Sequence, residues 1–314
     1  MMKIKSIFIM SVIAIVCATN VCAQTDIDGI MMEKNALCVG PMFGYSSWTN
    51  YWEGTLKRDN ENLGKVSTTM YSLMGNYGIS NKLNVLFGVP YIKTEASAGT
   101  LKGMEGIQDL SLWLKWKAFS KKIGQGRLSL FAIGGYSLPM SDYVADFLPM
   151  AIGLHSKNLS FRGMADYQAG AWFGTASGTY TFRSNIEIDR TSYYTTEMHY
   201  SNEVEMPDAA SFNVRAGYRN KGLIAEAVLD NWTTLGGFDI TRNNMPFPSN
   251  KMNSTRILFN FKYDIPFHPQ LSLTGNAFTT IAGRNVGQAS GFNAGIFYVF
   301  DLSRHKKEET QDKN

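Results

Sequence analysis

The chain has 314 residues, of which 44% are hydrophobic and 18% are charged, and its formal net charge is +4. Its mean hydropathy is −0.16. The small net charge, with the one charge-rich stretch confined to 304–314, gives no signature of nucleic-acid binding. After the N-terminal stretch no run approaches the roughly 20 apolar residues that a membrane helix requires. Membrane strands remain compatible with this hydropathy, because their side chains alternate between lipid and lumen.

Residues 1–23 have the pattern of a secretory signal peptide. Lys3 and Lys5 form a basic start, 7–16 is apolar, and 21–23 supplies a small-residue cleavage pattern. Residues 24–36 are expected to form a short periplasmic segment before the first strand. This segment is too short for the full N-terminal hatch that plugs long-chain fatty-acid channels.

Strand-like runs follow, with the period of two that marks a half-buried strand. In one of them, Phe259 and Phe261 alternate with Asn260 and Lys262. The predicted runs cover 37–47, 67–79, 83–93, 106–119, 127–139, 160–174, 178–189, 209–219, 223–235, 252–265, 270–282 and 290–302.

The connections between these runs alternate in length. Those after the odd-numbered runs are long, and those after the even-numbered runs are tight turns at sites such as 80–82, 175–178 and 220–222. The eleventh connection, around 284–288, is short where the pattern predicts a long one, and is therefore the place where the strand count is least secure.

This alternation predicts an all-β fold: a transmembrane antiparallel up-and-down β-barrel of about 12 strands over 37–302. A soluble β-sandwich is the competing fold, but its strands usually have about five or six residues, fewer than these runs. An even strand count puts both termini in the periplasm and the long loops outside. Residues 303–314 are then a charged, solvated tail. The predicted location is the Gram-negative outer membrane, in contact with its lipid and lipopolysaccharide.

The last run carries a further pattern. Asn293, Gly295, Tyr298 and Phe300 have the spacing polar-x-Gly-x-x-aromatic-x-aromatic. This resembles the C-terminal signal of bacterial outer-membrane barrels, and the resemblance implies the barrel-assembly machinery as a partner. The tail after Leu302 departs from the many barrels that end on the aromatic residue.

Two stretches resemble an outer-membrane transporter family associated with phenol meta-cleavage (aromatic) degradation. One is 77–83 running into 88–91, and the other is 106–112 running to Lys115 and Trp116. The resemblance covers most of 37–302 and rests on short, architectural motifs. It implies passage of small, often hydrophobic or aromatic compounds across the outer membrane, and a small-molecule substrate as a partner.

Inward positions of the predicted strands are rich in charges of both signs. An unpaired charge away from water costs several kcal/mol, so each requires water or a partner. They either form a salt-bridge lattice that fills the lumen, or line a polar conduit and tune what passes. The predicted lumen-lining residues are Asp109, Lys115, Lys117, Arg162, Asp166, Arg183, Glu187, Arg215, Arg219, Glu226, Asp230, Arg256, Lys262 and Asp264.

Aromatic residues gather in the long connections. They are candidates for ligand contact in a hydrophobic entrance, but they could equally fold the loops down or lie at lipid headgroups. The candidates are Trp48, Tyr51, Trp52, Tyr143, Phe147 and Phe247.

An enzymatic alternative rests on His199 and Ser201. The sequence 199–202 resembles the His-x-Ser-Asn element of outer-membrane lipid A deacylases and phospholipases, in which a His activates a Ser nucleophile. Glu203 replaces the usual small residue, and His199 falls in a predicted loop. No metal-ligand cluster or cofactor motif appears in the sequence. The favoured hypothesis is therefore a non-enzymatic channel, with a charge-filled structural or surface-binding barrel as the first rival and a lipid hydrolase as the second.

Overall fold

The computed structural model describes residues 25–240 and 245–303. The predicted signal peptide and the charged tail beyond Ser303 lie outside these residues. In the described part of the chain, no helix is long and apolar enough to cross a membrane.

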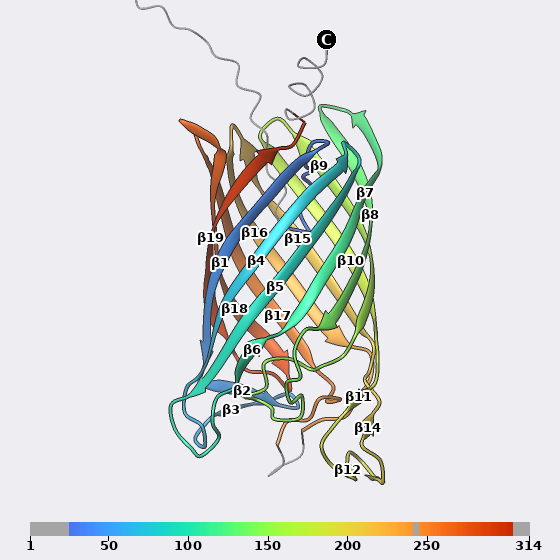
Figure 1. The fold of residues 1–314 in the computed structure, drawn as a ribbon, viewed down its shortest axis with the longest axis vertical. Coiled ribbons are helices and arrows are strands. Elements are labelled where there is room, and N and C mark those ends of the chain that lie inside the picture. The colour runs from blue at the N-terminus through green and yellow to red at the C-terminus, as the bar shows by residue number, and fades with distance from the viewer. Residues whose placement is uncertain (1–24, 241–244, 304–314) are drawn as a thin grey trace, which may run out of the picture.

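The fold is an all-β, closed antiparallel barrel of 12 long strands (Figure 1). Its wall strands are β1 (Ala36–Trp48), β4 (Val66–Ser80), β5 (Leu83–Ala96), β7 (Asp109–Ile123), β8 (Gly126–Pro139), β9 (Asn158–Ala169), β10 (Trp172–Arg183), β15 (Ala209–Asn220), β16 (Leu223–Thr234), β17 (Asn253–Ile265), β18 (His268–Arg284) and β19 (Ser290–Asp301). Consecutive wall strands pair with each other, and β1 pairs with β19 from Ala36↔Asp301 to Ser47↔Ser290 to close the barrel.

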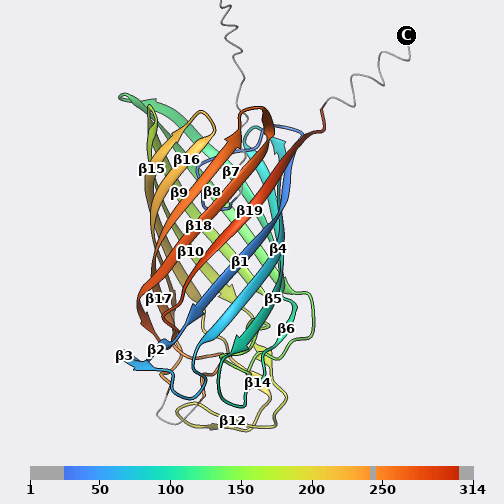
Figure 2. The same cartoon turned by 90° about the vertical axis from the view of Figure 1, so that its left-hand side faces the viewer.

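The two ends of the barrel differ, as the alternating connections predict. At one end, here called the turn end, short turns join the strands; at the other, the long-loop end, extended connections carry short strands (Figures 1 and 2). These are β2 (Asn50–Glu53), β3 (Leu56–Asp59), β6 (Glu105–Ile107), β11 (Ile186–Glu187), β12 (Tyr193–Tyr194), β13 (Met198–His199) and β14 (Glu203–Val204). The short connection at 285–289 does join two wall strands, so the predicted strand count holds at its weakest point.

Alternation gives each wall strand an apolar outer face and a polar inner face. On β17, Phe259 is 65% exposed on the outside, whereas Lys262 and Asp264 are buried inside. Such an outer face has the apolar character that a surrounding lipid bilayer requires.

One turn lies elsewhere than predicted. Sequence analysis puts the turn between the sixth and seventh strands at 175–178, but β9 ends at Ala169 and β10 begins at Trp172. Gly170 makes the turn with a φ of +60°, a conformation that favours glycine. Thr175 and Ser177 are instead buried on the inner face of β10, where small polar side chains leave room for the charged groups of the lumen. The run predicted at 106–119 is also divided, since β6 ends at Ile107 and β7 begins at Asp109.

Residues 25–34, here called the N-terminal plug, lie inside the barrel rather than forming the expected periplasmic segment. Asn35 N–H donates to Gly78 O at 2.8 Å at the turn end, just before β1 begins. From there the plug extends back to Lys115, in the middle of β7. Ile30 and Met32 pack against Phe173, Ile224 and Phe297 of the inner wall. The plug therefore fills part of the lumen in its turn-end half.

Candidate functional site

The lumen holds the candidate site, in which Lys115 joins the barrel wall to the N-terminal plug. This side chain is 0% exposed. Its Nζ donates to Asp28 Oδ1 at 2.9 Å, to Asp28 O at 2.5 Å, to Ile30 O at 2.8 Å and to Thr25 O at 3.3 Å. All four oxygens belong to the N-terminal plug. Lys115 therefore fixes the plug to the wall at mid-lumen.

Asp26 and Asp28 make the plug an anionic element between basic wall residues. Arg162 Nη1 pairs with Asp26, and the Arg162 guanidinium lies over the ring of Trp113 at 4.8 Å. Burial by itself raises the pKa of Asp28, but Lys115 and Arg215, with the Ile30 N–H, lower it to about 2. The Asp28 carboxylate is consequently ionised near neutral pH and remains attracted to the wall.

Ion pairs continue along β15–β17 beyond the plug. Arg215 donates to Glu226 at 2.8 Å, and Arg256 to Asp230 at 2.8 Å. Each carboxylate thus has a basic neighbour on the next strand, as buried charges require. Towards the turn end, Arg219 lies 3.4 Å from Asp166. Lys262 lies 2.8 Å from Asp264 on its own strand.

A cavity of about 190 Å³ separates the plug from the inner faces of β15–β18. It extends along β17 from Arg256 to Lys262 and is bounded on the opposite side by Ile27 and Ile30 of the plug. Six residue steps of a strand span about 20 Å. The cavity is therefore elongated along the wall, and both charged and apolar groups line it.

All but one of the predicted lumen-lining residues lie on inner faces of the wall. Besides those described above, Asp109 and Arg183 are at the long-loop end, and Lys117 is half-buried near Lys115. Glu187 is the exception. It is exposed in β11, within a long connection, and lies opposite Glu203 in the strand pairing of β11 with β14. In the pairing of β9 with β10, Arg162 is opposite Thr179 and Asp166 is opposite Thr175. The error at Glu187 follows from the misplaced turn at Gly170.

The loop aromatics pack among themselves at the long-loop end. Tyr143 is buried, and its hydroxyl donates to the Asp109 carboxylate while accepting the His155 N–H at 3.1 Å. Phe247 stacks on Tyr193 at 5.3 Å. Trp52 is buried beside Gly283. These contacts join the long connections to one another and to the ends of wall strands, which agrees with one of the roles considered for them, that of folding the loops down.

The other three loop aromatics, Trp48, Tyr51 and Phe147, lie in or near a cleft at the long-loop end. A cleft of about 1030 Å³ at the long-loop end is lined by Trp48 and Tyr51, with Leu56 of β3, Leu101 and Ile240 of neighbouring connections. Phe147 packs nearby against Met150, Val66 and Leu63. The cleft presents aromatic and aliphatic groups together with the charges of the β2–β3 hairpin.

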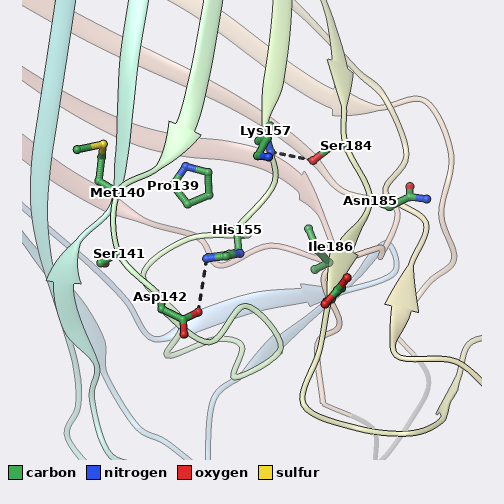
Figure 3. A pocket seen from close by; sticks show the side chains of 10 residues that line it. Pro139, Met140, Ser141, Asp142, His155, Lys157, Ser184, Asn185 and Ile186 are labelled. Atoms are coloured by element: carbon green, nitrogen blue, oxygen red, sulfur yellow. Dashed lines mark hydrogen bonds and ion pairs between the residues drawn. The ribbon is translucent and has the colours of Figure 1, made fainter.

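A further pocket of about 620 Å³ lies where β8, β9 and β10 meet their long connections (Figure 3). His155 and Asp142 face each other across it at 3.9 Å, and Lys157 N–H donates to Ser184 Oγ at 2.9 Å. The ring of His155 also packs edge-on against Tyr143 at 4.9 Å. The bond between Lys157 and Ser184 joins the connection after β8 to the one after β10.

His199 and Ser201 each make a hydrogen bond to another residue. His199 Nε2 is 2.9 Å from Thr195 Oγ1, and its ring stacks on Tyr193. Ser201 Oγ accepts the N–H of Glu203 at 3.0 Å. Within the described residues, no group of three or more His, Cys, Asp or Glu side chains is arranged to hold a metal ion.

The residues of the expected assembly signal share the last strand. Asn293 and Gly295 are on the inner face of β19, and Tyr298 and Phe300 are exposed on the outer face, with ring centroids 4.7 Å apart. The signal therefore forms part of the seam where β19 meets β1.

Sequence analysis missed the plug and with it Asp26 and Asp28. The only local signal is the alternation Asp26-Ile27-Asp28 before the first strand, which resembles an ordinary polar segment. Its meaning depends on Lys115 and Arg162, which are far away in sequence.

No protein-family model matches the sequence, and no curated protein is detectably similar to it. The structure is similar to an outer-membrane channel from Pseudomonas putida F1, over 86% of this chain and 97% of that chain, with a TM-score of 0.69 and 14% identity. The translocator domain of autotransporter NalP from Neisseria meningitidis matches 85% of this chain and 89% of its own, with a TM-score of 0.44 and 9% identity. A deltaS2 mutant of the monoaromatic hydrocarbon channel TodX matches 85% of this chain and 90% of its own, with a TM-score of 0.42 and 9% identity. The similarity to the Pseudomonas putida protein is one of fold: the chain has the fold of an outer-membrane β-barrel.

Proposed function

We propose that this protein is an outer-membrane channel for passive or facilitated passage of small compounds. The observation that carries the proposal is the cavity of about 190 Å³ between the plug and β15–β18. It leaves space inside the lumen beside fixed polar groups, and pores select what passes with groups of this kind. The shared fold with an outer-membrane channel supports the same reading.

The long-loop end supports passage of compounds with apolar parts. Its cleft of about 1030 Å³ offers Trp48, Tyr51 and Leu56 beside charged groups. A small, single-ring compound could be held there before it enters the lumen. This agrees with what the family resemblance implies, namely small hydrophobic or aromatic substrates.

We further propose that the long-loop end faces outward and that both termini are periplasmic. Short periplasmic turns and longer outer loops are the usual arrangement in such barrels. Lipid and lipopolysaccharide would surround exposed side chains such as Phe161 and Phe259, and the barrel-assembly machinery would read the last strand. An epitope inserted after Glu61, in the β3–β4 connection, should then be accessible to antibody on intact cells, whereas one inserted after Lys221 should not be.

The rival function, a structural barrel without transport, is favoured by the ion pairs and by the plug. Conductance in planar bilayers separates the two functions. We expect small, discrete currents from the purified protein and larger ones after deletion of 24–34, because deletion empties part of the lumen. A barrel lacking the plug that folds, as judged by heat-modifiable migration in gels, but stays silent would refute the channel.

A further inference from the structure

Two basic side chains face the cavity from the same level of the wall. In the strand register Arg219 of β15 is opposite Ile224 of β16, and Ile224 is opposite Lys262 of β17. Neighbouring strands are about 4.8 Å apart, so Arg219 and Lys262 flank Ile224 at a separation that long side chains bridge easily. All three residues line the cavity.

Both of these basic groups lack hydrogen bonds that they could make. The side chains of Arg219 and Lys262 are only 9% and 7% exposed. Among the described residues, Arg219 Nε has no hydrogen-bond acceptor. Lys262 Nζ is paired with Asp264 Oδ1 at 2.8 Å, and an ammonium has three N–H donors, so one such contact leaves donors of Lys262 unused. The contacts of Arg219 with Asp166 are long, at 3.4 Å, and Asp166 Oδ1 already accepts a bond from Thr175 at 2.6 Å.

The carboxylates that line the cavity already have hydrogen-bond partners other than Arg219 and Lys262. Asp28 accepts bonds from Lys115 and from the plug backbone at Thr25 and Ile30. Glu226 accepts from Arg215 at 2.8 Å and from Asn260 at 2.6 Å. Asp230 accepts from Asn213 at 3.1 Å and from Arg256 at 2.8 Å. The acidic groups are therefore neutralised in place, while donors at Arg219 and Lys262 remain available.

The rest of the cavity is apolar enough to hold a hydrocarbon body. Ile27 and Ile30 of the plug face Ile224, Val228 and Leu258 of the wall across it. Its volume is about 190 Å³, and an apolar protein cavity of about 150 Å³ binds benzene. By volume, the cavity is large enough for a single-ring molecule.

We propose that this cavity binds small organic monocarboxylates, with the carboxylate between Arg219 and Lys262 and an apolar or aromatic body against Ile27, Ile30 and Ile224. Charge-assisted hydrogen bonds to guanidinium and ammonium groups are the strong ones, and they would complete the bonding of two buried cations. The inference rests on the proposed channel function and adds a substrate class to it: organic acids rather than neutral aromatics.

Benzoate is the probe, and benzyl alcohol is its neutral counterpart of similar size. Binding to the purified full-length barrel is measured by titration calorimetry, with single-channel conductance recorded on the same preparation. Benzoate should bind, and Lys262→Met should weaken it at least about tenfold, since a hydrogen bond to a charged group is lost. Lys262→Arg should restore most of the affinity. Benzyl alcohol should bind more weakly and should change less than about twofold in either variant.

The control variant is Lys121→Met, which removes an exposed lysine near the turn end without touching the cavity. Heat-modifiable migration checks that each variant folds. If benzoate fails to bind a conducting channel, or if Lys262→Met weakens benzoate and benzyl alcohol equally, the carboxylate site is refuted while the channel stands. If benzoate binds as expected to a barrel that never conducts, the channel is refuted and the site stands.

Discussion

Replacing Lys115 by Met should free the N-terminal plug from the barrel wall. The substitution keeps the length of the side chain but removes the ammonium that contacts Thr25, Asp28 and Ile30. Asp28 would keep its bonds to the backbone of the plug and its attraction to Arg215. The plug would lose its ion pair with Lys115, while the ion pair between Asp26 and Arg162 would remain.

The expected size of this effect follows from the burial of the pair. Removing one partner of a buried ion pair costs about 3–5 kcal/mol, because the remaining charge is left uncompensated. At about 1.4 kcal/mol per factor of ten, the equilibrium between the docked and the released plug should shift by about two to three and a half orders of magnitude. Ile30 and Met32 still pack against the wall, so a partly docked population should remain.

Two assays report the release. Ile30→Cys places a thiol on the buried side of the plug, and its reaction with a water-soluble maleimide should be faster by about a hundredfold or more in the Lys115→Met background. Single-channel conductance of Lys115→Met should rise towards that of the barrel lacking 24–34. The protein without the Ile30→Cys substitution gives the background labelling.

Lys117→Met is the matched control, since Lys117 lies two residues further along the same inner face of β7. Among the described residues it has no hydrogen bond or ion pair to the plug. It should label and conduct like the parent protein. Equal labelling rates in the Lys115→Met and parent backgrounds, with unchanged conductance, would contradict the anchoring role of Lys115.

Three further predictions concern pH, the loops and assembly. Because the pKa of Asp28 is lowered from 3.8 to about 2 in the folded protein, its contribution to plug docking is complete above pH 4 and is lost as the pH falls towards 2. Conductance should therefore rise over this range in the parent protein and not in Asp28→Asn. Identical conductance profiles in the two proteins would contradict the role of Asp28 in docking. Tyr143→Phe removes the hydroxyl that joins Asp109 to His155, a loss of about 1–3 kcal/mol. Proteinase K should then cut 140–157 faster than in the lipid-facing control Tyr136→Phe. Equal cleavage rates would show that the hydrogen bonds of the Tyr143 hydroxyl do not hold the loop. Phe300→Ala should lower the amount of heat-modifiable barrel in the outer membrane, whereas Phe259→Ala, on an equally lipid-facing strand position, should not; equal amounts would remove the assembly role of the last strand.

The barrel could be predicted from the sequence because its signals are local. Alternation as in Phe259-Asn260-Phe261-Lys262 appears within one strand. The turn at 220–222 consists of Asn, Lys and Gly, and both Asn and Gly favour turns. Prediction failed where two local signals competed. The stretch Thr175–Gly178 looks like a turn in composition, but its small side chains face a crowded inner wall, while Gly170 makes the turn.

The lumen was harder to predict because its contacts connect distant parts of the chain. Alternation places Arg215 and Glu226 on the inner face. Their ion pair depends in addition on the register of β15 against β16, which a single strand does not specify. Alternation along the strand places Lys115 on the inner face, but its partners belong to the N-terminal plug, which has no strand pattern. The roles of Tyr143 and Phe247 as packed loop residues depend likewise on contacts across separate connections.

The pairing of the first and last wall strands sets the order in which this protein can be assembled. Every other contact between wall strands joins neighbours in the sequence, so those hairpins can form locally as the chain becomes available. The pairing of β1 with β19 joins Ala36 to Asp301 and must wait for the C-terminal strand. Until then both strands present unpaired edges, which are prone to wrong pairing. The plug is attached directly to β1, so the final closure of the cylinder would also enclose the peptide that occupies it.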